Sequence, residues 1–313
     1  MVLTASLVLL PLIFAGALGG RVAAQDIPSL SGPANDPLAT AKALVRDGNL
    51  AEAEAAARNF VETHLVSGEG HFLLGLILFR EHKSKESLAE YTEGSKYQLP
   101  SAADLKVVGL DYVLLDDYPD AEKWLTESTQ GNAADPIAWY SLGRVQYKLN
   151  HFDGALVSFQ KALELDPRNV KAEDNLGLAY QGLGRAQEAI ASYRQAIAWQ
   201  ATADHPSEQP LLNLGSLLIE RDDLQEATRL LESAVGIAPD NAKAQEQLGR
   251  AYLAQSNLGL AAQHLERAVA LSPDDSRLHF QLGQVYRKQG LTDKAKAEFA
   301  RTEALNGTKS TRQ

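Results

Sequence analysis

The chain contains no cysteine and only one methionine among its 313 residues. Without cysteine there are no disulfide bonds, no thiolate metal sites, no cysteine nucleophile and no lipid-bearing cysteine. Basic residues are also in the minority, because 30 Lys and Arg stand against 40 Asp and Glu, which gives a formal charge of −10. Binding to duplex DNA or RNA requires clustered Lys and Arg that neutralise phosphates, so we expect no nucleic-acid partner.

The short motifs that mark common enzymes are absent as well. The sequence has no HExxH pattern, no phosphate-binding loop and no GxSxG turn. Its seven histidines include no pair at the helix-face spacing of a metal site. We therefore predict a protein that is not an enzyme and that has no cofactor and no bound metal.

Prolines are few, twelve in all, while 45% of the residues are apolar and 22% are charged. These fractions are typical of folded proteins, and the abundance of Ala, Leu, Glu, Gln and Lys favours helices over strands. The composition therefore predicts an all-α protein.

Charged side chains are missing from Val2 to Gly20, and small residues, Ala23 and Ala24, precede Gln25. This pattern predicts a signal peptide at residues 1–24, cleaved before Gln25, and hence a periplasmic or secreted protein. The alternative is an uncleaved N-terminal anchor, because the apolar stretch is nearly long enough to span a bilayer. Pro11 and Arg21 argue against an anchor. With cleavage, we expect no stable membrane span.

A repeated pattern occupies the rest of the chain. Leu-Gly pairs recur at 74–75, 142–143, 176–177, 214–215, 248–249 and 282–283, and Val108-Gly109 fills the one gap. Twelve residues after each glycine stands an alanine or serine, and four residues later stands an aromatic residue or leucine. Two antiparallel helices pack closely where side chains are small, so we expect each glycine of the first helix to meet the alanine of the second.

One unit shows the pattern in full, with Trp139, Leu142-Gly143, Ala155, Phe159, Ala162 and Pro167. In these residues the sequence resembles the tetratricopeptide repeat (TPR) family. The resemblance implies a right-handed superhelical solenoid of about eight helix-turn-helix hairpins. The predicted units are 34–67, 68–101, 102–135, 136–169, 170–203, 208–241, 242–275 and 276–309, within an array at 34–309, preceded by a flexible leader at 25–33 and followed by a tail at 310–313.

Three features depart from the regular pattern. The first has Ala41 at the glycine position and Ala57 at the aromatic position, as terminal repeats often do. Four extra residues lie within 201–208, where we expect a longer surface loop. The last unit carries Lys294, Lys296 and Glu303 on its second helix, which indicates a polar outer face that caps the array.

In the TPR family the first helices line a concave groove, at positions 2, 5, 9, 12 and 13 of each unit. Of the forty residues at these positions twelve are basic and four are acidic, so the predicted groove carries +8 on an acidic chain. Asn175, Asn213, Gln247 and Gln281 follow at position 6 as a row of amides, similar to the asparagine ladder of O-linked N-acetylglucosamine transferase repeats. The predicted partner-binding residues are Arg80, Lys106, Tyr140, Arg144, Tyr147, Lys148, Lys171, Asn175, Asn213, Lys243, Gln247, Arg250, Arg277, Phe280, Gln281 and Arg287.

These features predict a protein-protein interaction scaffold that binds a protein or peptide, acidic or extended, in the basic groove. Two alternatives remain open. One is a substrate-recognition subunit for a separate glycosyltransferase-type enzyme, and the other is an architectural component of an envelope complex. Charge reversal in the groove separates them, since an architectural role would survive it.

Overall fold

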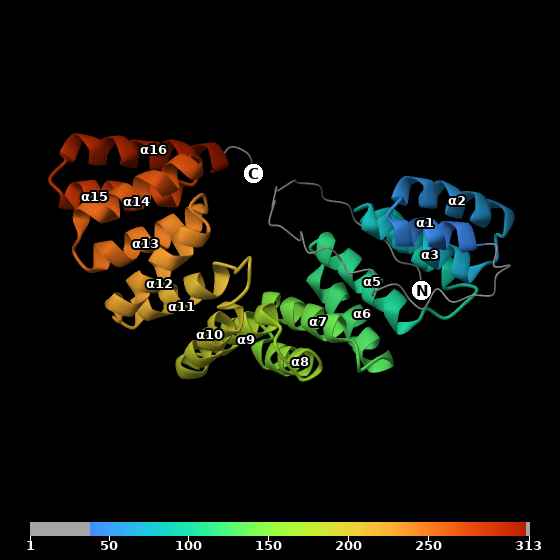
Figure 1. Ribbon diagram of the computed structural model, residues 1–313. Coiled ribbons are helices and arrows are strands. Elements are labelled where there is room, and N and C mark those ends of the chain that lie inside the picture. The colour runs from blue at the N-terminus through green and yellow to red at the C-terminus, as the bar shows by residue number, and fades with distance from the viewer. Residues whose placement is uncertain (1–37, 311–313) are drawn as a thin grey trace. The chain divides into compact units, whose positions relative to one another are not determined.

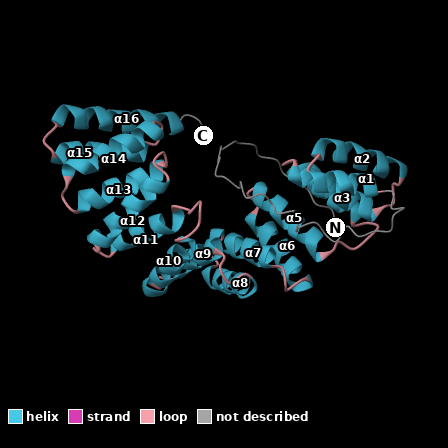
Figure 2. Cartoon of the chain, in the orientation of Figure 1, coloured by secondary structure: helices cyan, strands magenta, loops and turns pink. Residues whose placement is uncertain are grey.

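The computed structural model describes residues 38–310, and every element within that span is an α-helix (Figure 2). The sixteen helices alternate with short loops. The prediction of an all-α solenoid of eight hairpins is thus confirmed. The predicted signal peptide and leader lie outside the described residues, as do the start of the first unit and the last three residues of the tail.

The chain forms two compact units, which divide at Ala103 and Asp104. Unit 1 holds the first two hairpins (Figure 1). Its helices are α1 (Ala39–Asp47), α2 (Leu50–Thr63), α3 (Gly68–Arg80) and α4 (Ser84–Gly94).

Unit 2 holds the other six hairpins; the first of their helices begins two residues before the division (Figure 1). Its helices are α5 (Ala102–Leu114), α6 (Tyr118–Gly131), α7 (Pro136–Lys148), α8 (Phe152–Leu165), α9 (Val170–Gly182), α10 (Ala186–Gln200), α11 (Gln209–Glu220), α12 (Leu224–Ile237), α13 (Ala242–Ala254), α14 (Leu258–Leu271), α15 (Ser276–Lys288) and α16 (Thr292–Ser310). No helix in the described span is both long and apolar enough to cross a membrane.

Each hairpin turns at one residue with a left-handed backbone. Three of these residues are glycines, Gly48, Gly184 and Gly290, with φ of 81°, 72° and 78°. The other five are His82, Asp116, Asn150, Asp222 and Ser256. Glycine adopts this conformation without a Cβ clash, and Asn or Asp tolerates it better than most other residues. The left-handed residue ends the first helix and lets the chain reverse into the second.

The glycine of each Leu-Gly pair packs against the second helix, but its main partner differs from the expected alanine. A Cβ on Gly177 would lie 2.5 Å from the Tyr193 ring, and one on Gly143 would lie 2.7 Å from the Phe159 ring. The contact is therefore made with the aromatic residue or leucine four residues beyond the alanine. The alanine is needed for a different reason: Ala155 and Ala189 are fully buried and leave no room for a larger side chain.

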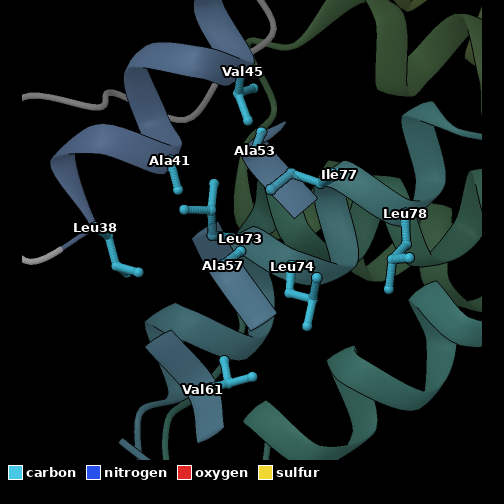
Figure 3. Close-up of a cluster of buried hydrophobic side chains, with 10 residues drawn as sticks. All are labelled: Leu38, Ala41, Val45, Ala53, Ala57, Val61, Leu73, Leu74, Ile77 and Leu78. Carbon is cyan, nitrogen blue, oxygen red and sulfur yellow. The ribbon is translucent and has the colours of Figure 1, made fainter. Parts of the chain in front are cut away.

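The core of unit 1 joins its two hairpins (Figure 3). Ala53 and Ala57 of α2 are fully buried and lie in one apolar cluster with Leu74 and Ile77 of α3. Phe60 packs against this cluster, and a Cβ on Gly70 would lie 2.8 Å from its ring. Small residues in the first hairpin thus still support a continuous core, although that hairpin departs most from the repeat pattern.

The cores of unit 2 pass from one hairpin to the next. Leu211 and Leu231 share an apolar cluster with Leu248, so consecutive hairpins bury each other's faces, as expected for a repeat protein. The four extra residues lie in the exposed connection between α10 and α11, as expected. There the Gln200 side chain donates to the Ser207 carbonyl oxygen at 2.7 Å and accepts from the Ser207 N–H at 2.9 Å.

The final helix has the polar outer surface that was predicted. Lys294, Lys296 and Glu303 are exposed on α16. Phe299 is only half-buried, whereas Phe159 at the same place in an internal hairpin is fully buried. No further hairpin within residues 38–310 covers Phe299, which accounts for the difference.

Candidate partner-binding face

The first helices of the four middle hairpins of unit 2 contact one another in succession. Helix α9 contacts both α7 and α11, and α11 in turn contacts α13. We call the residues at positions 2, 5, 9, 12 and 13 of these helices, and of α5 and α15, the first-helix face; positions are counted from the predicted start of each repeat. Unit 1 carries the corresponding positions of α1 and α3.

Several of the predicted cations on these helices already have partners within the protein. The Lys106 ammonium lies 2.8 Å from an Asp135 carboxylate oxygen, and that lysine is 6% exposed. Lys243 pairs with Glu246 at 3.0 Å, and Arg277 pairs with Asp275 at 2.8 Å. In unit 1, Arg80 donates to the Val45 carbonyl oxygen at 3.3 Å. The charge of the predicted groove is therefore partly balanced from within.

Other cations on the face have no carboxylate within 4 Å among residues 38–310: Arg144, Lys148, Lys171, Arg250 and Arg287. Arg144 and Arg250 are half-buried, and Lys148 and Lys171 are exposed. A half-buried guanidinium has lost part of its hydration, so it binds an anion more strongly than a fully solvated one.

Aromatic side chains lie beside these cations. The Arg144 guanidinium lies over the Tyr140 ring, 5.8 Å from its centre, and burial raises the pKa of the Tyr140 hydroxyl. Tyr147 packs against Phe152 with ring centres 5.6 Å apart, and burial likewise raises its pKa. These rings give the face an apolar contact surface next to its positive charge.

A second aromatic group lies on α15. Phe280 is 47% exposed and its ring centre lies 5.8 Å from that of Phe299. The Arg287 guanidinium lies 5.9 Å from the centre of the Phe299 ring. This group joins exposed apolar surface to a cation, as the one on α7 does.

The four amides of the predicted row are all engaged in hydrogen bonds within the protein. Asn175 donates to the Lys171 carbonyl oxygen at 2.7 Å and to the Tyr140 hydroxyl at 3.5 Å. Asn213 donates to both carboxylate oxygens of Asp174, at 2.9 and 3.1 Å. A ligand backbone would have to replace these bonds.

Gln247 and Gln281 continue the row on α13 and α15. The Gln247 side-chain oxygen accepts from Arg250 at 2.9 Å. Gln281 donates to Glu246 at 2.9 Å, and its own side-chain oxygen is buried with no hydrogen-bond partner in the described part of the chain. The ladder-like function of the row stays a prediction.

Sequence reasoning missed the special environment of Asp174. This residue is 4% exposed, and burial raises its carboxyl pKa to about 6, although the Asn213 hydrogen bond opposes the rise. Glu246, at the same position two repeats later, is 3% exposed and is bonded by Lys243 and Gln281. The available signal was an acid next to an amide in both repeats, Asp174-Asn175 and Glu246-Gln247.

Sequence models of the tetratricopeptide repeat match residues 38–102, 136–169 and 170–240, and a TPR-repeat model matches residues 249–290. Among curated proteins, the chain is 28% identical over 177 residues to the protein CTR9 homolog of Arabidopsis thaliana, covering 54% of this chain and 14% of the relative. It is 26% identical over 144 residues to anaphase-promoting complex subunit 3 of Schizosaccharomyces pombe, covering 46% of this chain and 21% of the relative. The chain thus spans less than a quarter of either relative.

Among solved structures, the Cut9 and Hcn1 hetero-tetramer of the APC/C is similar in fold, with a TM-score of 0.61 and 17% identity over 86% of this chain and 52% of that chain. The repeat matches cover most of the described residues, and the hairpins they predict are those of the structure. The chain belongs to the tetratricopeptide repeat family.

Proposed function

We propose that this protein is a non-catalytic interaction scaffold, and that the first-helix face of unit 2 binds a peptide segment or an acidic partner. Its family and its relatives support an interaction role. The relative in Schizosaccharomyces pombe is named as a subunit of the anaphase-promoting complex, which is a multi-protein assembly.

The observation that carries the proposal is the set of cations on this face that have no carboxylate within 4 Å among residues 38–310. Arg144, Lys148 and Arg250 lie on first helices, and two of them are half-buried. The chain as a whole is acidic, with a formal charge of −10, so a local positive surface attracts anionic ligands while the remainder repels them.

Binding is tested by reversing these charges. The full chain and the variant Arg144→Glu/Lys148→Glu/Arg250→Glu are used to capture proteins from the native compartment, and the captured proteins are identified by mass spectrometry. We expect the variant to lose the partner that the wild type captures. We also expect wild-type binding to weaken as salt is added, because the contact is electrostatic.

A matched control carries the same charge change away from the face. Arg221, Arg229 and Lys296 are exposed, and none of them is a first-helix-face residue. The variant Arg221→Glu/Arg229→Glu/Lys296→Glu is expected to retain the partner. Equal binding by both variants would overturn the proposed face and favour an architectural role. Capture of a glycosyltransferase through the face would identify the substrate-recognition alternative.

We further propose that the chain is exported and that residues 1–24 are removed. The uncharged stretch from Val2 to Gly20 and the small residues before Gln25 support this. Intact-mass measurement of the protein from its native host is expected to give a chain that starts at Gln25. A mass that includes residues 1–24 would instead favour N-terminal anchoring.

A further inference from the structure

Charges at two positions of neighbouring repeats face each other. In unit 1, Lys42 at position 9 of the first repeat lies 2.8 Å from Glu69 at position 2 of the next, 27 residues later. Because the repeats are built alike, we expect position 9 of one first helix to lie close to position 2 of the following one. An acid opposite a base at these positions forms an ion pair within the protein.

The same two positions in the fourth and fifth repeats both carry bases. Arg144 stands at position 9 and Lys171 follows 27 residues later at position 2. Their helices are joined here, since the Arg144 guanidinium lies over the Tyr140 ring and Asn175 bonds both the Tyr140 hydroxyl and the Lys171 carbonyl oxygen. Neither base has a carboxylate within 4 Å in the described span. By analogy with Lys42 and Glu69 we expect the two bases to lie close together, and like charges at that distance favour an anion between them.

The arrangement recurs three repeats later. Arg250 stands at position 9 of the seventh repeat, and Arg277 stands 27 residues on at position 2 of the eighth. Arg250 is held by the Gln247 side-chain oxygen, and Arg277 is paired with Asp275 at 2.8 Å. Glu246 also lies nearby and raises the pKa of Arg277, though less than Asp275 does. This second pair is therefore more strongly balanced than the first, and we expect it to bind anions more weakly.

Between the two basic pairs the corresponding positions are neutral or engaged. Leu178 is followed by Gln209, and Ser216 is followed by Lys243, which is paired with Glu246 at 3.0 Å. On α11 the only charged residue of the face is Glu220. The positive charge that is available to a ligand is thus concentrated at two places rather than spread evenly.

We propose that the pairs Arg144/Lys171 and Arg250/Arg277 are two anion sites for one ligand, an extended peptide with two acidic segments separated by a neutral one. This inference rests on the proposed function and specifies its ligand. Adjacent first helices lie about 10 Å apart, so three repeats separate the sites by roughly 30 Å. An extended chain covers that distance with about nine residues.

The test measures the affinity of the full chain for synthetic fluorescent peptides by anisotropy. One peptide has two Glu-Glu-Glu blocks separated by nine neutral residues, a second has the same blocks separated by two, and a third has one block. We expect the widely spaced peptide to bind at least ten times more tightly than the other two, because the second contact becomes intramolecular.

Variants assign the two sites. Arg144→Gln/Lys171→Gln and Arg250→Gln/Arg277→Gln are each expected to reduce the affinity for the widely spaced peptide to that of the single-block peptide. The control Arg229→Gln/Lys296→Gln changes exposed cations on α12 and α16 and is expected to bind like the wild type. Circular dichroism verifies that each variant keeps its helix content.

The outcomes distinguish this inference from the proposed function. If all three peptides bind with equal affinity and salt weakens their binding equally, the two-site arrangement is wrong. The proposed function, binding of an acidic ligand, would still stand. If none of the three peptides binds to the wild type, both the two-site inference and the proposed binding of an acidic peptide are wrong. If single-stranded DNA of similar length binds as tightly as the widely spaced peptide, the assignment to a peptide is overturned.

Discussion

Unit 1 and unit 2 contain similar hairpins but balance their buried charges differently. In unit 1, Glu54 accepts from Lys83 at 2.7 Å and from Arg58 at 2.7 Å, and these contacts lower its carboxyl pKa to about 2. In unit 2, Asp174 is held by an uncharged amide, and its pKa is raised to about 6. Ion pairs thus favour the charged form of Glu54, whereas burial disfavours the charged form of Asp174.

The difference is clearest at position 9 of the repeat. Lys42 in unit 1 is 6% exposed and faces Glu69, while in unit 2 Arg144 and the residue 27 positions later, Lys171, are both basic. Binding sites commonly hold arrangements that cost stability in the free protein, because the ligand supplies the missing partner. The comparison therefore supports the proposal that this part of unit 2 binds a ligand.

The largest effect is expected where the two units are alike, at the glycine that meets the second helix. A Cβ on Gly75 would lie 2.8 Å from the Tyr91 ring, and one on Gly177 would lie 2.5 Å from the Tyr193 ring. Gly75→Leu and Gly177→Leu are each expected to cost about 3 kcal/mol through overpacking. Thermal unfolding by circular dichroism measures both.

Gly236 provides the control, because a Cβ at that position meets nothing within 4 Å. Gly236→Leu on α12 is expected to leave stability unchanged or slightly raised, since leucine is the better helix former. An equal loss in all three variants would contradict the proposed packing register.

The second effect is a difference between the units in how their folding stability depends on pH. The pKa of Asp174 is raised from 3.8 to about 6, so the folded state is favoured by protonation and loses stability as the pH rises through about 6. Asp174→Asn is expected to raise the stability of unit 2 by about 2 kcal/mol at pH 8. The gain is expected to disappear below pH 4, where the carboxyl group is protonated in both states.

Trp124, Trp139 and Trp199 are the only tryptophans and all lie in unit 2, so their fluorescence during urea unfolding reports on that unit. A gain from Asp174→Asn that stays constant from pH 4 to pH 8 would reject a raised pKa. The pH dependence expected for Glu54 in unit 1 has the opposite sign. Its ion-paired carboxylate stabilises the folded state above pH 4.5, and this stabilisation is lost as the pH falls towards 2.

A smaller effect is expected when unit 1 is given the arrangement of unit 2. Glu69→Lys places a base opposite Lys42 and removes the ion pair at 2.8 Å. The side chain of Glu69 is 60% exposed, so solvent screens the change and we expect a loss of about 1 kcal/mol. Glu69→Gln is the neutral control and should lose less. A stability equal to that of the wild type in both variants would show that the pair does not contribute.

The hairpins were predictable from the sequence because their contacts recur. The glycine of each Leu-Gly pair lies sixteen positions before the aromatic residue or leucine that it contacts, as Gly143 does before Phe159. Aligning the repeats therefore reveals every such pair. The glycine was predicted to contact the alanine but contacts the aromatic residue or leucine instead. The reason is physical, because the larger side chain reaches across the space that the alanine leaves open. Recurrence thus identifies packing positions better than it identifies the atoms in contact.

The state of the charged residues was not predictable in the same way. Lys106 was assigned to the groove, but it is buried against Asp135, which also caps α7 by accepting from the Ile137 and Ala138 N–H groups. Such pairs join neighbouring repeats at separations of 27 or 29 residues and vary from repeat to repeat. Counting basic residues therefore overstated the positive charge that a ligand meets.

The central claim, that positions 144 and 171 face each other as like charges, is tested most directly by a double-mutant cycle. The melting temperature is measured for Lys171→Glu in the wild-type and in the Arg144→Gln background, which removes the contribution of the helix N-terminus common to both. We predict that Lys171→Glu raises the melting temperature more when Arg144 is present. The difference corresponds to a coupling free energy of about 0.5 kcal/mol between the two residues. Equal increments in the two backgrounds would show that the residues do not interact and would contradict the account.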